Sequence, residues 1–423
     1  MENLKDYQLN KKILCIDLKS FYASVECVLR GLDPFTTPLV VADKSIGEYA
    51  IVLAVTPYLK QMGVSSRCRV KDLPKDIDII FARPQMAKYM EYSTKVVDIY
   101  LDFVSEEDLY VYSVDEAFLD LTHYLSYYKM SAYEIAIKIL NEIYHRYKLT
   151  ATCGIGPNML LAKVSMDIEA KKTRYNIAEW TYDDVETKLH KIEPLSKMWG
   201  IGHRMEHNLN LLGIFTIEDL AKYDKNKLKS IYGVMGLELW YHANGIDMSL
   251  IQEKGKLRNN PKSFGTSQVL PKTYNAKEIY TIILEMTDEV TRRLRLSKKV
   301  CKTIGLMIGD ATHTQGFSRQ LSLDMPTSST KEIFETCLLL FDLYYENYPI
   351  KNVGIQLSNL SEQKYQQLSL FEDVDTLEKT FNLEYTLDKV KQRFGKNKVL
   401  RATSLEEHAT AKKRNEQVGG HHV

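Results

Sequence analysis

The sequence predicts an α+β fold of several domains, one of which is built on a ferredoxin-like sheet. The chain has 423 residues, which is more than one ordinary core organises. Between residues 12 and 172, the apolar patterns follow the order strand, helix, two strands, helix, strand, which is the order of a ferredoxin-like sheet. A short β-rich piece, residues 30–82, is inserted after the first helix.

Each element of this sheet has its own local signal. Residues 12–18 (KILCIDL) form an apolar run typical of a buried strand, and residues 20–31 show helical spacing before a closing glycine. Residues 108–122 alternate as two strands joined by a bend. The remaining predicted elements are a helix at 85–104, a helix at 131–147, a strand at 149–156 and a helix at 158–172.

The rest of the chain divides into a helical part, a second mixed part and a polar end. Residues 183–250 predict short helices, and residues 257–261 (LRNNP) predict a polar linker that ends in proline. Residues 262–358 mix strands and helices. Residues 361–375 are polar apart from one short apolar motif.

Composition and charge exclude several classes of protein. The chain is 44% apolar and 26% charged, and no stretch approaches the roughly 20 apolar residues of a membrane span. The N-terminus lacks the apolar core of a secretory signal, so we expect a cytoplasmic protein. The six cysteines form no C-x-x-C pair, which argues against a zinc ribbon or a disulfide framework.

Positive charge is concentrated in one segment, although the whole chain carries only +1. Residues 252–320 contain 13 Lys and Arg against 6 Asp and Glu. Contact with a phosphate backbone needs such an excess, although a solvated surface would show the same count.

Three carboxylates fall where strands of the predicted sheet end. Asp17 closes the first strand, and Asp115 and Glu116 stand at the bend between the next two. Neighbouring residues on a straight strand face opposite sides, so these two acids can face one site only if the bend rotates one of them. Clustered carboxylates repel unless a cation neutralises them, and hard oxygen ligands favour Mg²⁺. The alternative is an acidic pair that is simply solvated at a turn.

Two motifs resemble those of a known family. Residues 16–26 (IDLKSFYASVE) resemble the opening motif of the Y-family translesion DNA polymerases, and residues 112–120 (YSVDEAFLD) resemble their second metal motif. Residues 83–93, 154–156 and 161–163 carry further landmarks in the family's order. The resemblance covers about residues 11–360 and is closest to the UmuC-like branch.

The resemblance implies a template-directed, low-fidelity DNA polymerase that uses two Mg²⁺ ions. Asp17, Asp115 and Glu116 would be the catalytic metal ligands, together with the carbonyl of Leu18. Tyr22 matches the steric gate that excludes ribonucleotides, with Phe21 beside it in the nucleotide site. Two lysines match the cations that contact the incoming dNTP triphosphate: Lys60 and Lys163.

The resemblance also implies a right-hand polymerase. The palm would be residues 1–29 and 83–180, the fingers 30–82, the thumb 181–252 and the little finger 258–360, followed by a flexible tail at 361–423. Fingers this small check the nascent base pair weakly, which would permit synthesis past damaged bases. No segment resembles a proofreading exonuclease.

Further motifs imply contacts with primer-template DNA. Gly200 and Gly202 lie in a sequence like a helix–hairpin–helix, where backbone N–H groups approach a phosphate. The stretches that resemble backbone-contacting parts of the little finger contain Lys262, Ser263 and Arg319. Residues 203–207 also read H-x-x-E-H, a zinc-hydrolase pattern, but no third ligand stands out.

A short apolar motif follows the last predicted domain. It resembles the peptide with which bacterial polymerases hold the sliding clamp, and its anchors are Gln367, Leu368, Leu370 and Phe371. An accessory subunit is a further candidate partner.

Three other functions share parts of these patterns. A metal-dependent nuclease would use the same carboxylates but would shorten DNA without dNTP. A non-catalytic subunit that binds the clamp and DNA would extend nothing. A zinc hydrolase would hold zinc through the two histidines of residues 203–207.

Overall fold

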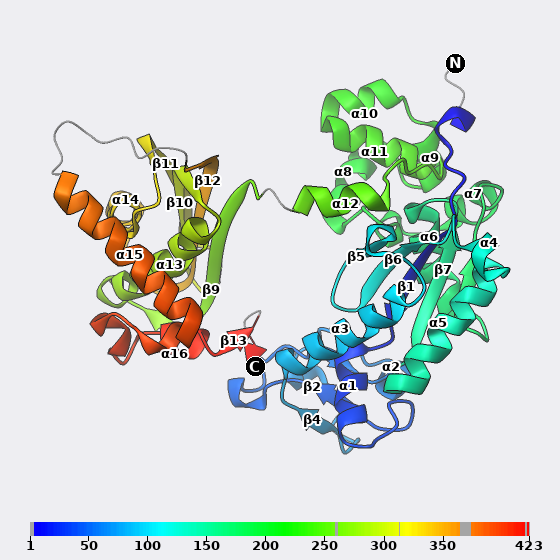
Figure 1. Cartoon of the computed structure of the whole chain (residues 1–423), viewed down its shortest axis with the longest axis horizontal. Coiled ribbons are helices and arrows are strands. Elements are labelled where there is room, and N and C mark those ends of the chain that lie inside the picture. Colours follow the sequence, from blue (N-terminus) through cyan, green and yellow to red (C-terminus); the bar gives the residue numbers. More distant parts are fainter. Residues whose placement is uncertain (1–3, 259–260, 313, 364–373, 419–420, 423) are drawn as a thin grey trace. The chain divides into compact units, whose positions relative to one another are not determined.

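The computed structural model describes residues 4–258, 261–312, 314–363, 374–418 and 421–422 (Figure 1). The chain divides near residue 260 into two compact units. We refer to them as the N-terminal unit and the C-terminal unit. Among the described residues, no helix is long and apolar enough to cross a membrane.

The N-terminal unit is built on a five-stranded sheet in the order β5-β6-β1-β7-β8. Its central strand pairs antiparallel with β6 on one side and β7 on the other. This is the predicted ferredoxin-like arrangement, extended at one edge by β8, which pairs parallel to β7 and was not anticipated from the sequence. The strands are β1 (Ile13–Leu18), β5 (Leu109–Val111), β6 (Glu116–Asp120), β7 (Ala151–Gly156) and β8 (Ile177–Glu179).

Helices cover both faces of this sheet, which explains the continuous apolar run of β1. Leu14 and Ile16 pack in one cluster with apolar residues of α1 (Phe21–Leu29), α3 (Met86–Leu101) and α5 (Ala132–Tyr147). Their neighbours Ile13 and Cys15 face the other side, in a cluster with Met159 and Ala162 of α6 (Met159–Ile168). A strand buried on both faces has no polar side, so it does not alternate.

The approach of α6 to β7 depends on glycine. A Cβ atom on Gly154 would lie 2.0 Å from the Ala162 carbonyl oxygen, and one on Gly156 would lie 2.4 Å from the Ala162 nitrogen. Both distances are far below van der Waals contact, so only glycine lets the helix pack this closely.

The inserted segment forms a small sheet with its own core. Strands β2 (Leu39–Val41), β3 (Ala54–Val55) and β4 (Ile80–Ala82) are ordered β3-β2-β4, and α2 (Pro57–Gln61) packs beside them. Val40, Val55 and Leu59 are buried together here, apart from the main-sheet clusters.

A group of short helices completes the N-terminal unit. Its separate apolar cluster includes Trp180, Leu209 and Leu228. We expected residues 257–261 to form a linker, but α12 (Ile251–Arg258) includes the first two of them. The polar composition of that stretch therefore did not end the helix. The other helices are α4 (Leu125–Tyr128), α7 (Asp184–Thr187), α8 (His203–Leu211), α9 (Ile217–Lys222), α10 (Lys225–Tyr232) and α11 (Val234–Ala243).

The C-terminal unit contains a four-stranded antiparallel sheet in the order β11-β10-β12-β9. Apolar residues of α13 (Ala276–Leu296) and α14 (Thr330–Tyr344) join those of the sheet in one core. This confirms the mixture of strands and helices expected for residues 262–358. The strands are β9 (Ser263–Tyr274), β10 (Lys299–Gly309), β11 (Gly316–Thr327) and β12 (Ile350–Glu362).

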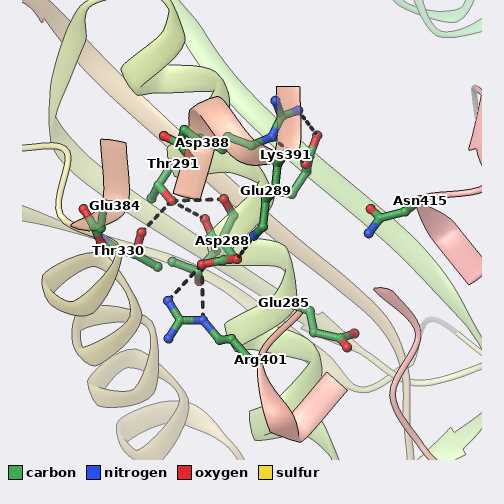
Figure 2. Close-up of polar contacts among 12 residues, drawn as sticks. Glu285, Asp288, Glu289, Thr291, Thr330, Glu384, Asp388, Lys391, Arg401 and Asn415 are labelled. Atoms are coloured by element: carbon green, nitrogen blue, oxygen red, sulfur yellow. Dashed lines mark hydrogen bonds and ion pairs between the residues drawn. The ribbon is translucent and has the colours of Figure 1, made fainter. Parts of the chain in front are cut away.

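The end of the chain is ordered over residues 374–418, which corrects the expectation of a flexible tail. Helix α15 (Val374–Phe394) and α16 (Ala411–Arg414) are joined by a segment that packs on α13. Figure 2 shows the reason: Asp288 of α13 pairs with Lys391 and Arg401 of the tail, at 2.7 and 2.9 Å. Charged residues of this segment have partners elsewhere in the unit, which holds the segment in place. The predicted clamp-binding anchors at 367–371 lie outside the described residues.

Candidate active site

The three predicted carboxylates meet at one end of the central strands. Asp17 pairs in register with Glu116 on β6 and with Thr152 on β7, so it lies inside the sheet. The Leu18 N–H donates to the Asp115 carbonyl at 2.9 Å, which ties the bend to the end of β1. The structure therefore brings Asp17, Asp115 and Glu116 together as the sequence predicted.

The bend that we required between the two acids is present. Residues 112–115 lie between β5 and β6, and the N–H groups of Tyr112 and Ser113 both donate to the Glu116 carbonyl, at 2.9 and 3.0 Å. The Ser113 hydroxyl donates to the Asp115 carboxylate at 2.7 Å. Asp115 therefore stands on the bend while Glu116 begins the strand, which removes the strict alternation of a straight strand.

The local charge favours a bound cation. The pKa of Asp17 is raised to about 7, chiefly because burial removes water from the carboxylate; Lys171 opposes this rise, and the nearby acids Asp115 and Glu116 contribute to it. A divalent cation would remove this repulsion, and carboxylate and carbonyl oxygens are the ligands that Mg²⁺ prefers. The donor set of Asp17, Leu18, Asp115 and Glu116 fits such an ion.

In the part of the chain that the structure describes, no three His, Cys, Asp or Glu side chains form a ready metal-ligand cluster. Two of the three predicted metal-binding carboxylates form ion pairs with lysines. Lys163 Nζ lies 2.9 Å from Glu116, and Lys171 Nζ lies 3.7 Å from Asp17. The H-x-x-E-H residues 203–207, which are described in the structure, likewise form no such cluster. The His203 side chain is almost fully exposed, and its Nδ1 lies 3.6 Å from Glu206 Oε2.

Of the two predicted triphosphate lysines, Lys163 is the more tightly placed. It is 8% exposed, and burial opposes its charge, yet Cys15, Glu116 and Asp167 hold its pKa above the ordinary value. Lys60 lies on α2, where burial lowers its pKa and the attraction of Asp17 partly offsets that effect. Both cations therefore lie within electrostatic reach of the carboxylates.

One cation at this site was missed in the sequence. Lys171 pairs with Asp17 and, at 2.9 Å, with Asp167, which also holds Lys163 at 3.0 Å. Lys163, Asp167 and Lys171 are spaced four residues apart, so helical spacing could have grouped them.

Tyr22 and Phe21 have different environments at the start of α1. Phe21 is buried in the main core, as expected for core packing. Tyr22 is only partly buried, and its ring stacks on Tyr89 at a centroid distance of 4.4 Å. Burial and the nearby Asp115 carboxylate both raise the pKa of Tyr22, so this ring lies close to the acidic site.

The predicted hairpin residues lie before α8. Gly200 has a φ of 91°, a left-handed conformation that favours glycine, and Gly202 precedes the first residue of the helix. Between them, Ile201 is buried in the helical cluster and anchors the hairpin. Gly202 is the N-cap of α8 and gives the first helical turn no side-chain hydrogen bond, and a helix N-terminus is where backbone N–H groups can approach a phosphate.

The predicted DNA contacts of the C-terminal unit lie on opposite edges of its sheet. Lys262 and Ser263 are exposed at the start of β9, whereas Arg319 is exposed on β11. The sequence could not show this separation, because it depends on strand order.

Three segments of the chain match the models of one known protein family. Residues 16–167 match the model of the impB/mucB/samB family, residues 261–370 match the C-terminal domain of that family, and residues 182–214 match the HHH motif of the IMS family. The last two ranges contain the predicted little-finger stretches and the glycine hairpin.

Relatives match over nearly the whole chain. The putative UV-damage repair protein UvrX of Bacillus subtilis (strain 168) is 42% identical over 415 residues, covering 97% of each protein. DNA polymerase IV 2 of the same organism is 34% identical, covering 97% of this chain and 99% of that protein.

A solved structure has the same fold. The Y-family DNA polymerase chimera Dbh-Dpo4(243-245)-Dbh superimposes with a TM-score of 0.65 at 22% identity, over 83% of this chain and 99% of the chimera. The α+β polymerase fold predicted from the sequence is thereby confirmed. The matches and the acidic site on a ferredoxin-like sheet show that the chain belongs to the impB/mucB/samB family and is a Y-family DNA polymerase.

Proposed function

We propose that this polymerase copies damaged templates with low fidelity by two-metal nucleotidyl transfer. The observation that carries the proposal is the meeting of Asp17, Asp115 and Glu116 at the strand ends of one sheet. Membership of the family carries dependence on a divalent metal and binding of primer-template DNA. That the metal is Mg²⁺, and that two ions act together, belongs to the proposal.

The carboxylates would hold the ions on the sheet. When bound, two Mg²⁺ ions lower the pKa of the primer 3′-hydroxyl and stabilise the leaving pyrophosphate. Asp17, Asp115 and Glu116 would orient them through side-chain oxygens, and Leu18 through its carbonyl. The bend at residues 112–115 supports this role because it frees Asp115 from the pleat of the strand.

The lysines would orient the triphosphate. Lys163 and Lys171 already face the carboxylates, and Lys60 lies within their field. As phosphate charge enters the site, the ammonium groups of Lys163 and Lys171 can each exchange a carboxylate partner for a phosphate oxygen. A cation fixed beside the leaving group stabilises the charge that develops there.

We assign the parts of the right hand as follows. The main sheet is the palm and the helical cluster is the thumb, whose hairpin at Gly200 and Gly202 would contact a phosphate. The β2–β4 insertion is the fingers, and so small a core leaves few groups to test the nascent pair. The C-terminal sheet is the little finger, with Lys262, Ser263 and Arg319 contacting the DNA backbone. A sliding clamp is the proposed partner of residues 367–371.

Extension of a labelled primer past an abasic site tests the proposal. We expect bypass with Mg²⁺ and dNTPs by the wild type and none by Asp115→Ala. The matched control is Asp183→Ala, an exposed acid in the same unit, which should leave extension unchanged. No extension by the wild type, even with a sliding clamp, would favour the non-catalytic subunit, and shortening of the primer would favour a nuclease.

A further inference from the structure

Tyr22 is supported from behind by a second ring. The Tyr22 and Tyr89 rings lie 4.4 Å apart with an angle of 15° between their planes, a stacked arrangement. Phe21 touches Tyr22 only at a tilt of 47° and 5.6 Å. Tyr89 therefore covers one face of the Tyr22 ring and limits its movement in that direction.

Tyr89 is itself fixed in place. It belongs to the first turn of α3 and is 1% exposed. Its hydroxyl donates to the Glu26 carboxylate at 2.5 Å. Glu26 lies four residues after Tyr22 on α1, so the helix that carries Tyr22 also anchors the ring behind it.

The acceptor is a fully buried carboxylate with a complete set of partners. Glu26 is 0% exposed, pairs with Arg30 and accepts from the Gln85 amide at 3.1 Å. Buried charges persist in proteins where they are paired and hydrogen-bonded. Burial and the bond to Glu26 raise the pKa of Tyr89 above its ordinary value, so its hydroxyl keeps the proton that it donates.

We propose that Tyr89, held by Glu26, is a positioning residue that keeps the Tyr22 ring in place and thereby contributes to the selection of deoxynucleotides. This inference rests on the proposed role of Tyr22 as the steric gate. A gate excludes a 2′-hydroxyl only if its ring does not yield, so the stiffness of the support sets how strongly the hydroxyl is rejected. Tyr89 is 1% exposed and stacks on Tyr22, so it would act on the nucleotide through Tyr22.

Ordinary core packing is the competing explanation for Tyr89. It predicts that changing this residue lowers stability and slows both nucleotide types equally. The positioning role predicts a change in the ratio between them. The ratio of kcat/KM for a dNTP to that for the matching ribonucleotide separates the two explanations.

The test compares four variants with the wild type in single-nucleotide incorporation. Tyr22→Ala removes the gate, Tyr89→Leu removes the supporting ring, and Tyr89→Phe keeps the ring but loses the bond to Glu26. Tyr92→Leu is the matched control: it lies on the same helix, and its ring faces Tyr147 at 6.2 Å. Tyr89→Phe is nearly isosteric and keeps the test decisive if Tyr89→Leu does not fold.

We expect the ratio to fall most in Tyr22→Ala, about 5-fold in Tyr89→Leu, about 2-fold in Tyr89→Phe and not at all in Tyr92→Leu. A 5-fold change corresponds to about 1 kcal/mol, a typical value for one aromatic pair. If Tyr22→Ala loses discrimination while both Tyr89 variants match Tyr92→Leu, the supporting role is refuted and the gate stands. If Tyr22→Ala itself keeps the wild-type ratio, the proposed gate is refuted, and this inference with it.

Discussion

The ordered tail of the C-terminal unit can be tested through one buried ion pair. Arg295 of α13 is 6% exposed and holds Asp388 of α15 with two bonds, at 2.7 and 3.1 Å. The same guanidinium donates to the Ser328 carbonyl at 3.0 Å and to Glu384 at 3.2 Å. Changing Asp388 to Ala would therefore leave a buried cation with only part of its partners.

The expected loss follows from these contacts. Removing one partner of a buried pair costs about 3–5 kcal/mol, and the low end applies because Glu384 and Ser328 remain. About 3 kcal/mol would raise amide exchange in α13 about 150-fold, since each 1.36 kcal/mol is a factor of ten. The matched control is Glu335→Ala, which breaks the exposed pair with Lys331 (3.9 Å) and should cost less than about 1 kcal/mol.

Hydrogen–deuterium exchange read by mass spectrometry is the suitable assay. All three tryptophans, at 180, 199 and 240, lie in the N-terminal unit, so their fluorescence does not report on the tail. Asp388→Ala should increase the rate of amide exchange in α13 and α15, whereas the amides of β1 should exchange as fast as in the wild type. Equal exchange in Asp388→Ala and Glu335→Ala would refute the idea that the tail is a structural part of this unit. Replacing both Arg295 with Met and Asp388 with Leu should restore much of the protection.

Three further predictions concern the site, the DNA contacts and the sheet. Lys163→Ala should lower kcat/KM for dNTP about 10- to 100-fold in single-turnover kinetics, because a cation beside the triphosphate is lost. The control is Lys172→Ala, which removes an exposed lysine and should change kcat/KM by less than about 2-fold. Arg319→Ala should weaken primer-template binding on all sequences and reduce the slope of log affinity against log salt by about one, measured by anisotropy; an unchanged slope would contradict a phosphate contact. Gly154→Ala should lower the free energy of unfolding, measured by tryptophan fluorescence, by about 1–3 kcal/mol, because the new Cβ would clash with the Ala162 carbonyl. A variant as stable as the wild type would show that α6 can move away from β7 without loss of stability.

Sequence patterns could predict the sheet and the acids because both depend on neighbours along the chain. The buried strand that carries Asp17 near its end and the bend before Glu116 each have a local signal, and the ferredoxin-like order places them side by side. Family motifs then identified the chemistry, which composition alone could not.

The missed features depend on contacts between distant segments. Glu26 and Tyr89 are 63 residues apart, so nothing local indicates that they share a hydrogen bond. Helix α15 was predicted to be part of a flexible tail, because the residues that hold it in place are far away in the sequence. Arg295 of α13 and Asp388 of α15, for example, are more than 90 residues apart. Lys171 is different, since its helical spacing from Lys163 was visible in the sequence.

The most direct test of the central claim is the rate of single dNTP incorporation on undamaged DNA, measured against Mg²⁺ concentration. Asp115→Asn keeps the shape of the side chain on the bend but removes its charge. We expect the wild-type rate to rise with Mg²⁺ and the variant to be slower by about 1000-fold or more at saturation, as lost metal-ion stabilisation of several kcal/mol requires. A variant that stays within 10-fold of the wild type would show that these carboxylates do not carry the reaction.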